Sequence, residues 1–226
     1  MATKTETMGD SQRTYIPAAG HDWFLPLYDP IVKLLGGDRA RRALLDQAAI
    51  QPGQRVLEIG CGTGSLAMLI QRLHPDVNIV GLDPDPKALA RARRKVERAR
   101  PPIQFDCGFS DALPYPGASF DRVFSSFMFH HLQEAEKEKT LREVWRVLKP
   151  GGFFHMVDFG GPESSGDGPL ARWLHSSHRL KDNSESRILT LMSEAEFADP
   201  KTVHHGIMFV WRIAYYSASV PATRSS

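Results

Sequence analysis

A glycine-rich turn between a predicted strand and a predicted helix constrains the fold of this chain more than any other stretch. The segment RVLEIGCGTGSLA, residues 55–67, opens with an apolar run that is typical of a short strand buried on both faces. Apolar residues then recur at helical spacing, at Leu66, Leu69, Ile70 and Leu73. Between the two, glycines permit positive φ angles, and the new helix points free N–H groups at the turn. The segment predicts a strand–turn–helix unit that binds a nucleotide-like ligand.

The rest of the chain predicts a sheet covered by helices. Apolar runs predict further strands at 78–83, 103–107, 120–126 and 153–158, and helices are predicted at 27–35, 39–49, 86–99, 134–148, 170–180 and 186–197. Two closing strands, at 202–205 and 209–217, are expected to turn near Gly206. Alternating strands and helices are typical of a parallel sheet. The fold class is therefore α/β: a Rossmann-like, doubly wound sheet of about seven strands, mostly parallel with an antiparallel last strand, with helices on both faces.

Composition and charge exclude several classes of protein. Among the 226 residues, 42% are hydrophobic and the net charge is +2, which is too small to indicate a nucleic-acid or membrane partner. No apolar run approaches the roughly 18 residues of a membrane-spanning helix. The two cysteines, Cys61 and Cys107, form no metal-binding spacing, so a reducing cytoplasm is the expected compartment. Nothing in the sequence indicates an oligomeric state.

The spacing of the glycines favours one kind of cofactor over another. A dinucleotide fingerprint starting at Gly60 needs glycine or alanine at its sixth position, where this chain has Ser65. The pattern present is Glu58-x-Gly60-x-Gly62-x-Gly64, with an acid inside the strand. No phosphate-cradling motif accompanies the turn. The ligand is therefore expected to carry no phosphate.

This pattern resembles the first motif of the class I S-adenosylmethionine-dependent methyltransferases. The resemblance extends from Tyr28 to about Gly160 and is nearest to the small-molecule enzymes that include the ubiquinone/menaquinone C-methyltransferases. Five stretches carry it in the family's order: VLEIGCGTGSLA at 56–67, VGLDPDPKAL at 80–89, the Leu113–Pro116 turn, SFDRVFSSFMFHHL at 119–132 and LREVWRVLKPGGFFHMVDF at 141–159. The implied cofactor is S-adenosyl-L-methionine, and the implied partner is a small-molecule methyl acceptor.

The resemblance implies a role for each residue of the donor site. Glu58 would orient the glycine turn and the cofactor's amino group, and Asp83 would accept hydrogen bonds from the ribose hydroxyls. The methionine part and ribose would lie against the glycine turn at Gly60, Cys61, Gly62 and Gly64. Adenine would lie between Pro84 and the segment from Cys107 through Gly108 and Phe109 to Ser110. The methyl group would be bordered by residues 125–128, which include Ser126 and Met128.

Two parts of this assignment have alternatives. Relatives commonly carry an acid or amide that binds the adenine amino group where this chain has Phe109. Either the Phe109 ring packs there instead, which the alignment favours, or the loop is shifted and Asp111 serves. Tyr28 would close over the methionine carboxylate, as similar tyrosines do in relatives; the alternative is a buried aromatic that only packs its helix.

Histidines supply the other candidates. His130, after the fourth strand, would act as base for an acceptor proton, although a polar start to the next helix is the commoner explanation for such a residue. His175 and His178 lie on one helical face, but no third ligand is evident and no metal site is predicted. The basic run at 91–100 is expected to be the solvated face of its helix.

The function predicted is methyl transfer from S-adenosylmethionine to a small molecule by in-line displacement, for which positioning supplies roughly 7–11 kcal/mol of barrier lowering. An apolar or aromatic acceptor is suggested by Trp23, Tyr28 and Trp173. The alternatives are a non-catalytic S-adenosylmethionine-binding protein of the same fold, motivated by Phe109, and a nicotinamide oxidoreductase, against which Ser65 speaks. Aminopropyl transfer on the same fold is a remote fourth.

The expected domain organisation follows from these assignments. Residues 1–14 form a disordered tail, and 15–220 form a single methyltransferase domain. Within that domain, 15–50 are an N-terminal helical lid, 51–160 the cofactor-binding core, 161–200 variable acceptor-side helices, and 201–218 the closing strands.

Overall fold

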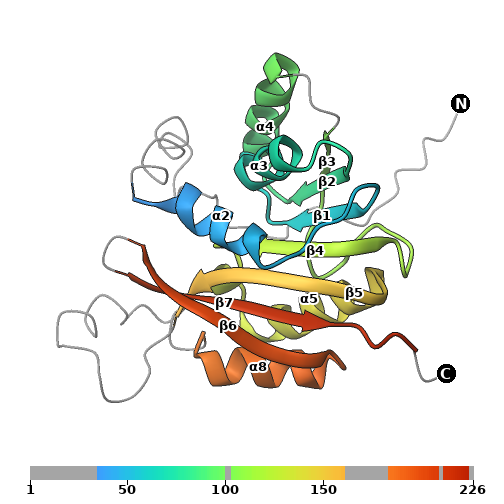
Figure 1. Cartoon of the computed structure of the whole chain (residues 1–226), viewed down its shortest axis with the longest axis vertical. Coiled ribbons are helices and arrows are strands. Elements are labelled where there is room, and N and C mark those ends of the chain that lie inside the picture. The colour runs from blue at the N-terminus through green and yellow to red at the C-terminus, as the bar shows by residue number, and fades with distance from the viewer. Residues whose placement is uncertain (1–34, 100–102, 161–182, 209–210, 224–226) are drawn as a thin grey trace, which may run out of the picture.

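The computed structural model describes residues 35–99, 103–160, 183–208 and 211–223, and Figure 1 shows their arrangement. A seven-stranded sheet with the order β3-β2-β1-β4-β5-β7-β6 runs through the molecule. Its strands are β1 (Arg55–Ile59), β2 (Asn78–Asp83), β3 (Ile103–Cys107), β4 (Phe120–Ser126), β5 (Leu148–Phe159), β6 (Ala198–Met208) and β7 (Trp211–Ser219). The helices are α2 (Gly37–Asp46), α3 (Ser65–Leu73), α4 (Pro86–Ala99), α5 (Glu134–Val147), α8 (Glu185–Glu194) and the 3-10 turn η2 (Phe129–His131).

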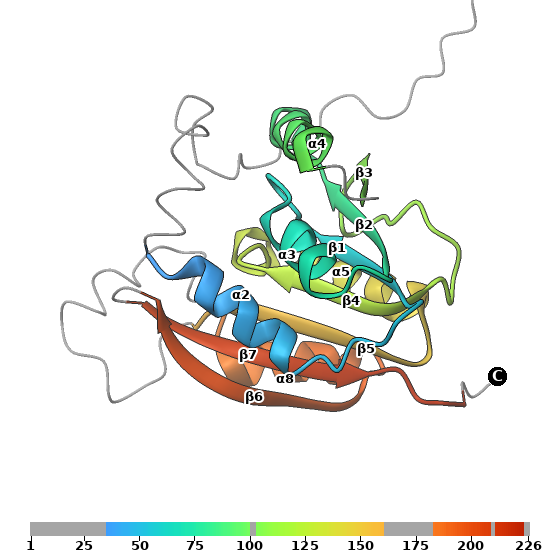
Figure 2. The same cartoon turned by 45° about the horizontal axis from the view of Figure 1, so that its top comes forward.

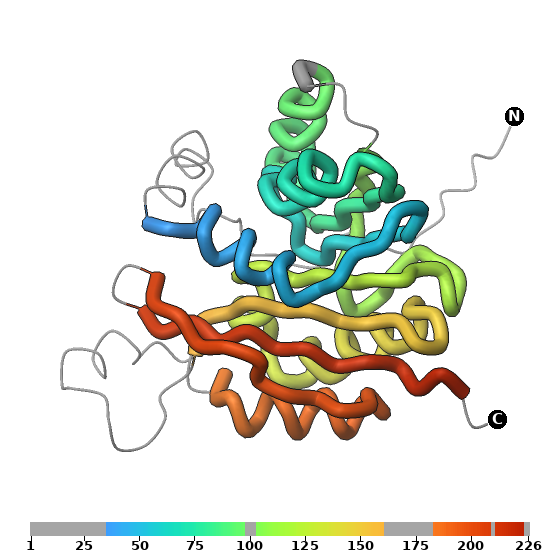
Figure 3. Tube along the Cα trace, viewed as in Figure 1, coloured from blue at the N-terminus to red at the C-terminus, as the bar shows by residue number. Residues whose placement is uncertain are grey.

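The direction of the strands confirms the expected fold class. Strands β1 to β5 pair in parallel, whereas β7 runs antiparallel to both of its neighbours, β5 and β6. The carboxyl ends of β4 and β5 therefore lie beside the beginning of β7, at the edge of the sheet where the parallel strands end, as the trace in Figure 3 shows. In an open parallel sheet, ligands bind at this edge, outside the carboxyl ends of the strands, and we call it the ligand side of the sheet.

The helices form two layers around the sheet, as Figure 2 shows. One apolar cluster joins the sheet to α2, α3 and α4, and includes Leu44, Leu66 and Leu89. The other joins it to α5 and α8, and includes Leu141, Val144 and Leu191.

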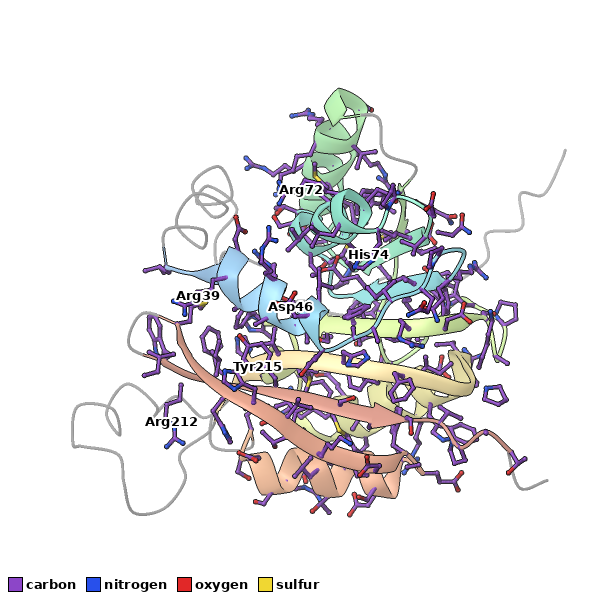
Figure 4. All side chains as sticks on the ribbon, in the orientation of Figure 1. Arg39, Asp46, Arg72, His74, Arg212 and Tyr215 are labelled. Atoms are coloured by element: carbon purple, nitrogen blue, oxygen red, sulfur yellow. The ribbon has the colours of Figure 1, made fainter. Side chains whose placement is uncertain are left out.

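Figure 4 shows Arg39 of α2 on the same face of the sheet as Tyr215 of β7. Burial raises the pKa of Tyr215, and the Arg39 guanidinium opposes part of that rise.

The turn predicted near Gly206 is wrong. Gly206 is not at a turn: β6 continues to Met208, and Gly206 pairs with Ile213 inside the ladder. A Cβ at position 206 would lie 3.2 Å from the Ile213 side chain, so this glycine serves close packing within a strand. The four apolar residues predicted at helical spacing all lie in α3: Leu66, Leu69 and Ile70 are buried, and Leu73, the last residue of the helix, is 38% exposed.

Several predicted features lie outside the described residues. These are the tail at 1–14, the helix at 27–35 except its last residue, the helix at 170–180, and Trp23, Tyr28, Trp173, His175 and His178. The described part of the chain contains no helix that is both long enough and apolar enough to cross a membrane.

Candidate active site

The glycine turn bends sharply because three of its residues take left-handed backbone angles. The φ angles are 65° at Gly60, 51° at Gly62 and 74° at Gly64, where α3 begins. The Cys61 N–H donates to the Leu82 carbonyl at 3.0 Å, which joins the turn to β2. Residues other than glycine are strained at such angles, because their Cβ atom crowds the backbone. The sequence thus places open backbone, followed by a helix N-terminus, at the ligand side of the sheet.

Packing explains two of these glycines further. A Cβ at Gly60 would lie 2.2 Å from the Met128 Cγ, and one at Gly64 would lie 2.8 Å from the Phe105 ring. Gly60 therefore lets the turn touch the segment that follows β4, and Gly64 lets α3 approach β3. Met128, predicted to border the methyl group, lies directly against the glycine turn.

Glu58 holds the start of α3 from inside β1. Its Oε2 accepts a hydrogen bond from the Ala67 N–H at 2.8 Å, and the side chain is 2% exposed. Burial raises the pKa of Glu58 to about 8, although the Arg41 charge and the Ala67 amide act to lower it. The structure places Glu58 where it fixes the turn; its role toward the cofactor's amino group stays a prediction.

Asp83 joins the ends of β2 and the glycine turn. Its Oδ2 accepts from the Gly62 N–H at 2.8 Å and its Oδ1 from the Asp85 N–H at 2.9 Å. Burial raises the pKa of Asp83 to about 6, in spite of these two backbone donors. Each oxygen keeps a further lone pair, so the carboxylate can accept from ligand hydroxyls while it holds the turn.

Two basic residues of α4 bind backbone carbonyls in addition to facing solvent: Arg93 is exposed and Lys95 is half-buried. Lys95 Nζ donates to the Thr63 carbonyl at 2.9 Å, and Arg93 donates to the Phe105 carbonyl at 2.8 Å. Their long apolar stems allow the charged heads to reach back to backbone carbonyls. Lys95 thus supports the glycine turn, a role that helical spacing alone does not reveal.

The predicted adenine walls meet at the ends of β2 and β3. The Cys107 thiol lies 3.8 Å from the Pro84 carbonyl, and the Gly108 N–H donates to the Asp83 carbonyl at 3.2 Å. Ser110 pairs its hydroxyl with Thr140 of α5 at 2.9 Å, so its hydroxyl is bound to α5. Phe109 and Asp111 are both half-buried. Their alternative roles toward adenine stay predictions.

Beyond β4 the chain makes a strained turn. Phe127 has a φ of 56°, which is unfavourable for a bulky residue, and its N–H donates to the Val157 carbonyl at 2.9 Å. Ser125 and Ser126 before it are buried, and neither hydroxyl has a hydrogen-bond partner within the described part of the chain. Buried hydroxyls usually have partners, so this turn presents polar atoms suited to a ligand.

His130 and Asp158 form a hydrogen-bonded pair at the carboxyl ends of β4 and β5. His130 Nδ1 lies 2.6 Å from Asp158 Oδ1, and the His130 backbone N–H donates to Oδ2 at 3.0 Å. Burial raises the pKa of Asp158, but the His130 ring and the backbone donors outweigh it and hold this pKa below its ordinary value. An ionised carboxylate there fixes the Nδ1 proton and leaves Nε2 as an acceptor.

The position of His130 combines both explanations given for it. Its 3-10 turn, η2, directly precedes α5, as a polar helix start would. Its ring is nevertheless mostly buried and is hydrogen-bonded to Asp158. A histidine that served only as a polar helix start would need neither burial nor this partner. Asp158 has no signal of its own in the sequence, because 28 residues separate it from His130.

Comparison with known proteins identifies the family. The sequence profile described as "Methyltransferase domain" matches residues 56–152. A demethylmenaquinone methyltransferase of Deinococcus radiodurans is 39% identical over 158 residues, which cover 69% of this chain and 64% of that protein. One of Thermus thermophilus is 37% identical over 150 residues, which cover 65% of this chain and 67% of that protein. The chain belongs to the class I S-adenosylmethionine-dependent methyltransferases.

Solved structures agree on the fold of this methyltransferase. Phosphoethanolamine N-methyltransferase 2 of Haemonchus contortus, in complex with S-adenosyl-L-methionine, has a TM-score of 0.75 at 16% identity, covering 90% of this chain and 58% of that one. The YcgJ protein of Bacillus subtilis has a TM-score of 0.70 at 19% identity, covering 81% of this chain and 99% of that one. At such identities the likeness concerns the fold alone.

The residues present fit S-adenosylmethionine, the cofactor of this family. Asp83 offers buried acceptors for ribose hydroxyls, and the unpartnered hydroxyl of Ser126 lies at the end of β4 beside the turn that Met128 closes. No arginine or lysine is needed for phosphate, which the cofactor lacks. Among the described residues, no group of three or more histidine, cysteine, aspartate or glutamate side chains is placed to hold a metal ion.

Proposed function

We propose that this chain transfers a methyl group from S-adenosylmethionine to a small aromatic acceptor of the quinone or quinol type, with His130 as the base. The observation that carries the proposal is the contact between the two halves of the site. Met128 packs against Gly60 of the donor turn, and His130 follows two residues later in η2. The predicted base is therefore tied to the predicted methyl donor through one short segment.

The chemistry of each residue follows from its position. When bound, S-adenosylmethionine supplies a methyl carbon activated by its sulfonium. Glu58, Asp83 and the glycine turn would hold that group, and Met128 would help to exclude water from it. The acceptor atom gains a bond to the methyl carbon as the carbon–sulfur bond breaks and its electron pair stays on sulfur. His130 Nε2 would take the acceptor's proton, and the Asp158 carboxylate would stabilise the imidazolium that forms.

An aromatic acceptor is supported by the surroundings of His130. The Phe159 ring lies edge-on to the His130 ring, with centroids 5.0 Å apart, and contacts Phe127 at 5.1 Å and Trp211 at 6.1 Å. These aromatic side chains come from the ends of β4 and β5 and the start of β7, on the ligand side of the sheet. Planar aromatic ligands pack well against such rings. The names of the two relatives above, which are demethylmenaquinone methyltransferases, support a quinone-type ring.

The direct test is incubation of the full chain with methyl-labelled S-adenosylmethionine and reduced demethylmenaquinone, followed by mass identification of the product. We expect one labelled methyl group on the ring, and none when the acceptor is omitted. Tight binding of S-adenosylmethionine without transfer, either to this acceptor or to a metabolite extract, would support the non-catalytic alternative. Binding of NADH in place of S-adenosylmethionine would support the oxidoreductase.

A further inference from the structure

Lys137 is a lysine of α5 whose side chain is completely buried in the protein. It is 0% exposed, whereas Lys139 on the same helix is exposed. Burying an ammonium group costs several kcal/mol unless partners replace its hydration. Lys137 Nζ donates to Asn183 Oδ1 at 3.0 Å and lies 5.5 Å from the centroid of the Phe129 ring. Neither solubility nor apolar packing explains a lysine that is buried at this cost.

Two contacts of Lys137, with Phe129 and with Asn183, lead to the two sides of the His130–Asp158 pair. Phe129 immediately precedes His130 in η2. On the other side, Asn183 Nδ2 donates to the Phe159 carbonyl at 2.6 Å, and Phe159 immediately follows Asp158. The Phe159 N–H donates in turn to Asp158 Oδ1 at 2.7 Å. Hydrogen bonds therefore link the Lys137 ammonium to Asn183 and Asn183 to the Phe159 carbonyl, and the N–H of the same Phe159 binds the carboxylate.

We propose that Lys137 is a positioning residue that holds the His130–Asp158 pair in register. It does so by contacting Phe129, which precedes His130, and, through Asn183, Phe159, which follows Asp158. Four segments meet there: η2, the carboxyl end of β5, α5 and Asn183, which lies two residues before α8. The 2.6 Å contact between His130 Nδ1 and Asp158 Oδ1 requires close alignment of ring and carboxylate. Lys137 contacts η2 directly at Phe129 and reaches the end of β5 at Phe159 through Asn183. The catalytic consequence rests on the function proposed above; the geometric claim does not.

The test uses the folded full chain without any acceptor. Histidines are labelled with ¹⁵N, and the resonances of His130 are assigned by their loss in His130→Gln. In the wild type we expect a single Nδ1-protonated tautomer with a protected, far-downfield Nδ1 proton, as a short bond to a carboxylate produces. Lys137→Met keeps the length and burial of the side chain but removes its charge and donor. It should abolish the protected proton and mix the tautomers, whereas Lys139→Met should leave both unchanged.

A second variant guards against misfolding. Leucine is close in size to asparagine, and Asn183→Leu removes the bonds to both the Phe159 carbonyl and Lys137 without changing a residue of α5. It should cause the same loss. Affinity for S-adenosylmethionine, measured by calorimetry, should stay within a factor of two in each variant, because the donor turn is held by other residues. A folded variant, Lys137→Met or Asn183→Leu, that retains the protected proton and one tautomer would overturn the proposal. Failure of methyl transfer in the wild type would instead overturn the proposed function and leave this result unaffected.

Discussion

The proposed donor side and the proposed acceptor side of the site are built in different ways. The donor turn is held mainly by residues of one contiguous motif and the next strand: Glu58 accepts from the Ala67 N–H in the first turn of α3, and Asp83 accepts from the Gly62 N–H. Lys95 of α4 adds a bond to the Thr63 carbonyl. The acceptor side joins residues from four separate segments, namely His130, Asp158, Lys137 and Asn183. The acids also differ, because burial raises the pKa values of Glu58 and Asp83 whereas His130 helps to lower that of Asp158. Binding the donor and activating the acceptor are thus expected to be separable by mutation.

The largest effect is expected from Asp158→Asn. The amide preserves shape but no longer fixes the Nδ1 proton of His130 or stabilises the imidazolium. Methyl transfer should fall by roughly 10²–10⁴-fold in kcat, while the affinity for S-adenosylmethionine stays within a factor of two. Steady-state kinetics and calorimetry on one sample measure both. A matching fall in cofactor affinity would show that the two sides are not separable.

The complementary change on the donor side is Asp83→Ala. It removes a carboxylate expected to accept two charged hydrogen bonds from ribose, each worth about 1.5–3 kcal/mol. The Kd for S-adenosylmethionine should rise at least about 100-fold, whereas the His130 tautomer should not change. Calorimetry and the ¹⁵N spectrum test this pair of statements, and unchanged affinity would remove Asp83 from the site.

A pH series tests the raised pKa of Glu58. A pKa raised from 4.5 to about 8 means that the folded protein holds the proton more tightly than the unfolded chain. The associated stability is present below pH 4.5 and is lost as the pH rises through about 8. In Glu58→Gln this loss should shrink by about 2–4 kcal/mol between pH 5 and pH 8. Urea unfolding at several pH values measures it, and identical pH slopes in both proteins would contradict the assignment.

The smallest effect concerns packing across the junction of the two sides. Gly60→Ala would place a methyl group against Met128 at a φ of 65°, and should destabilise the fold by about 1–3 kcal/mol. Met128→Ala in the same chain should relieve the clash with the Met128 Cγ, but neither the 2.7 Å contact with its Cβ nor the backbone strain. A double-mutant cycle from urea unfolding gives the coupling, and a coupling of zero would place Met128 away from the turn.

The sequence predicted the features that depend on neighbouring residues. The bounds of β2, β3, β4 and α4 follow from apolar periodicity and from Pro86 at the helix start, and the structure has them at the predicted residues. Features that depend on contacts between distant segments were not predicted. Lys95 reaches a carbonyl 32 residues away, and Lys137 reaches Asn183 46 residues away. Gly206 was misassigned because a glycine that packs inside a strand resembles one that makes a turn.

The most direct test of the account is the comparison of His130→Gln with the wild type in two measurements on the same sample. One is the rate of labelled methyl transfer to reduced demethylmenaquinone, and the other is the Kd for S-adenosylmethionine, with His204→Gln on the exposed surface of β6 as the matched control. We predict a fall of about 10²-fold or more in the rate with a Kd within a factor of two, and no change in the control. An unchanged rate in His130→Gln, or a rate and an affinity that fall together, would contradict it.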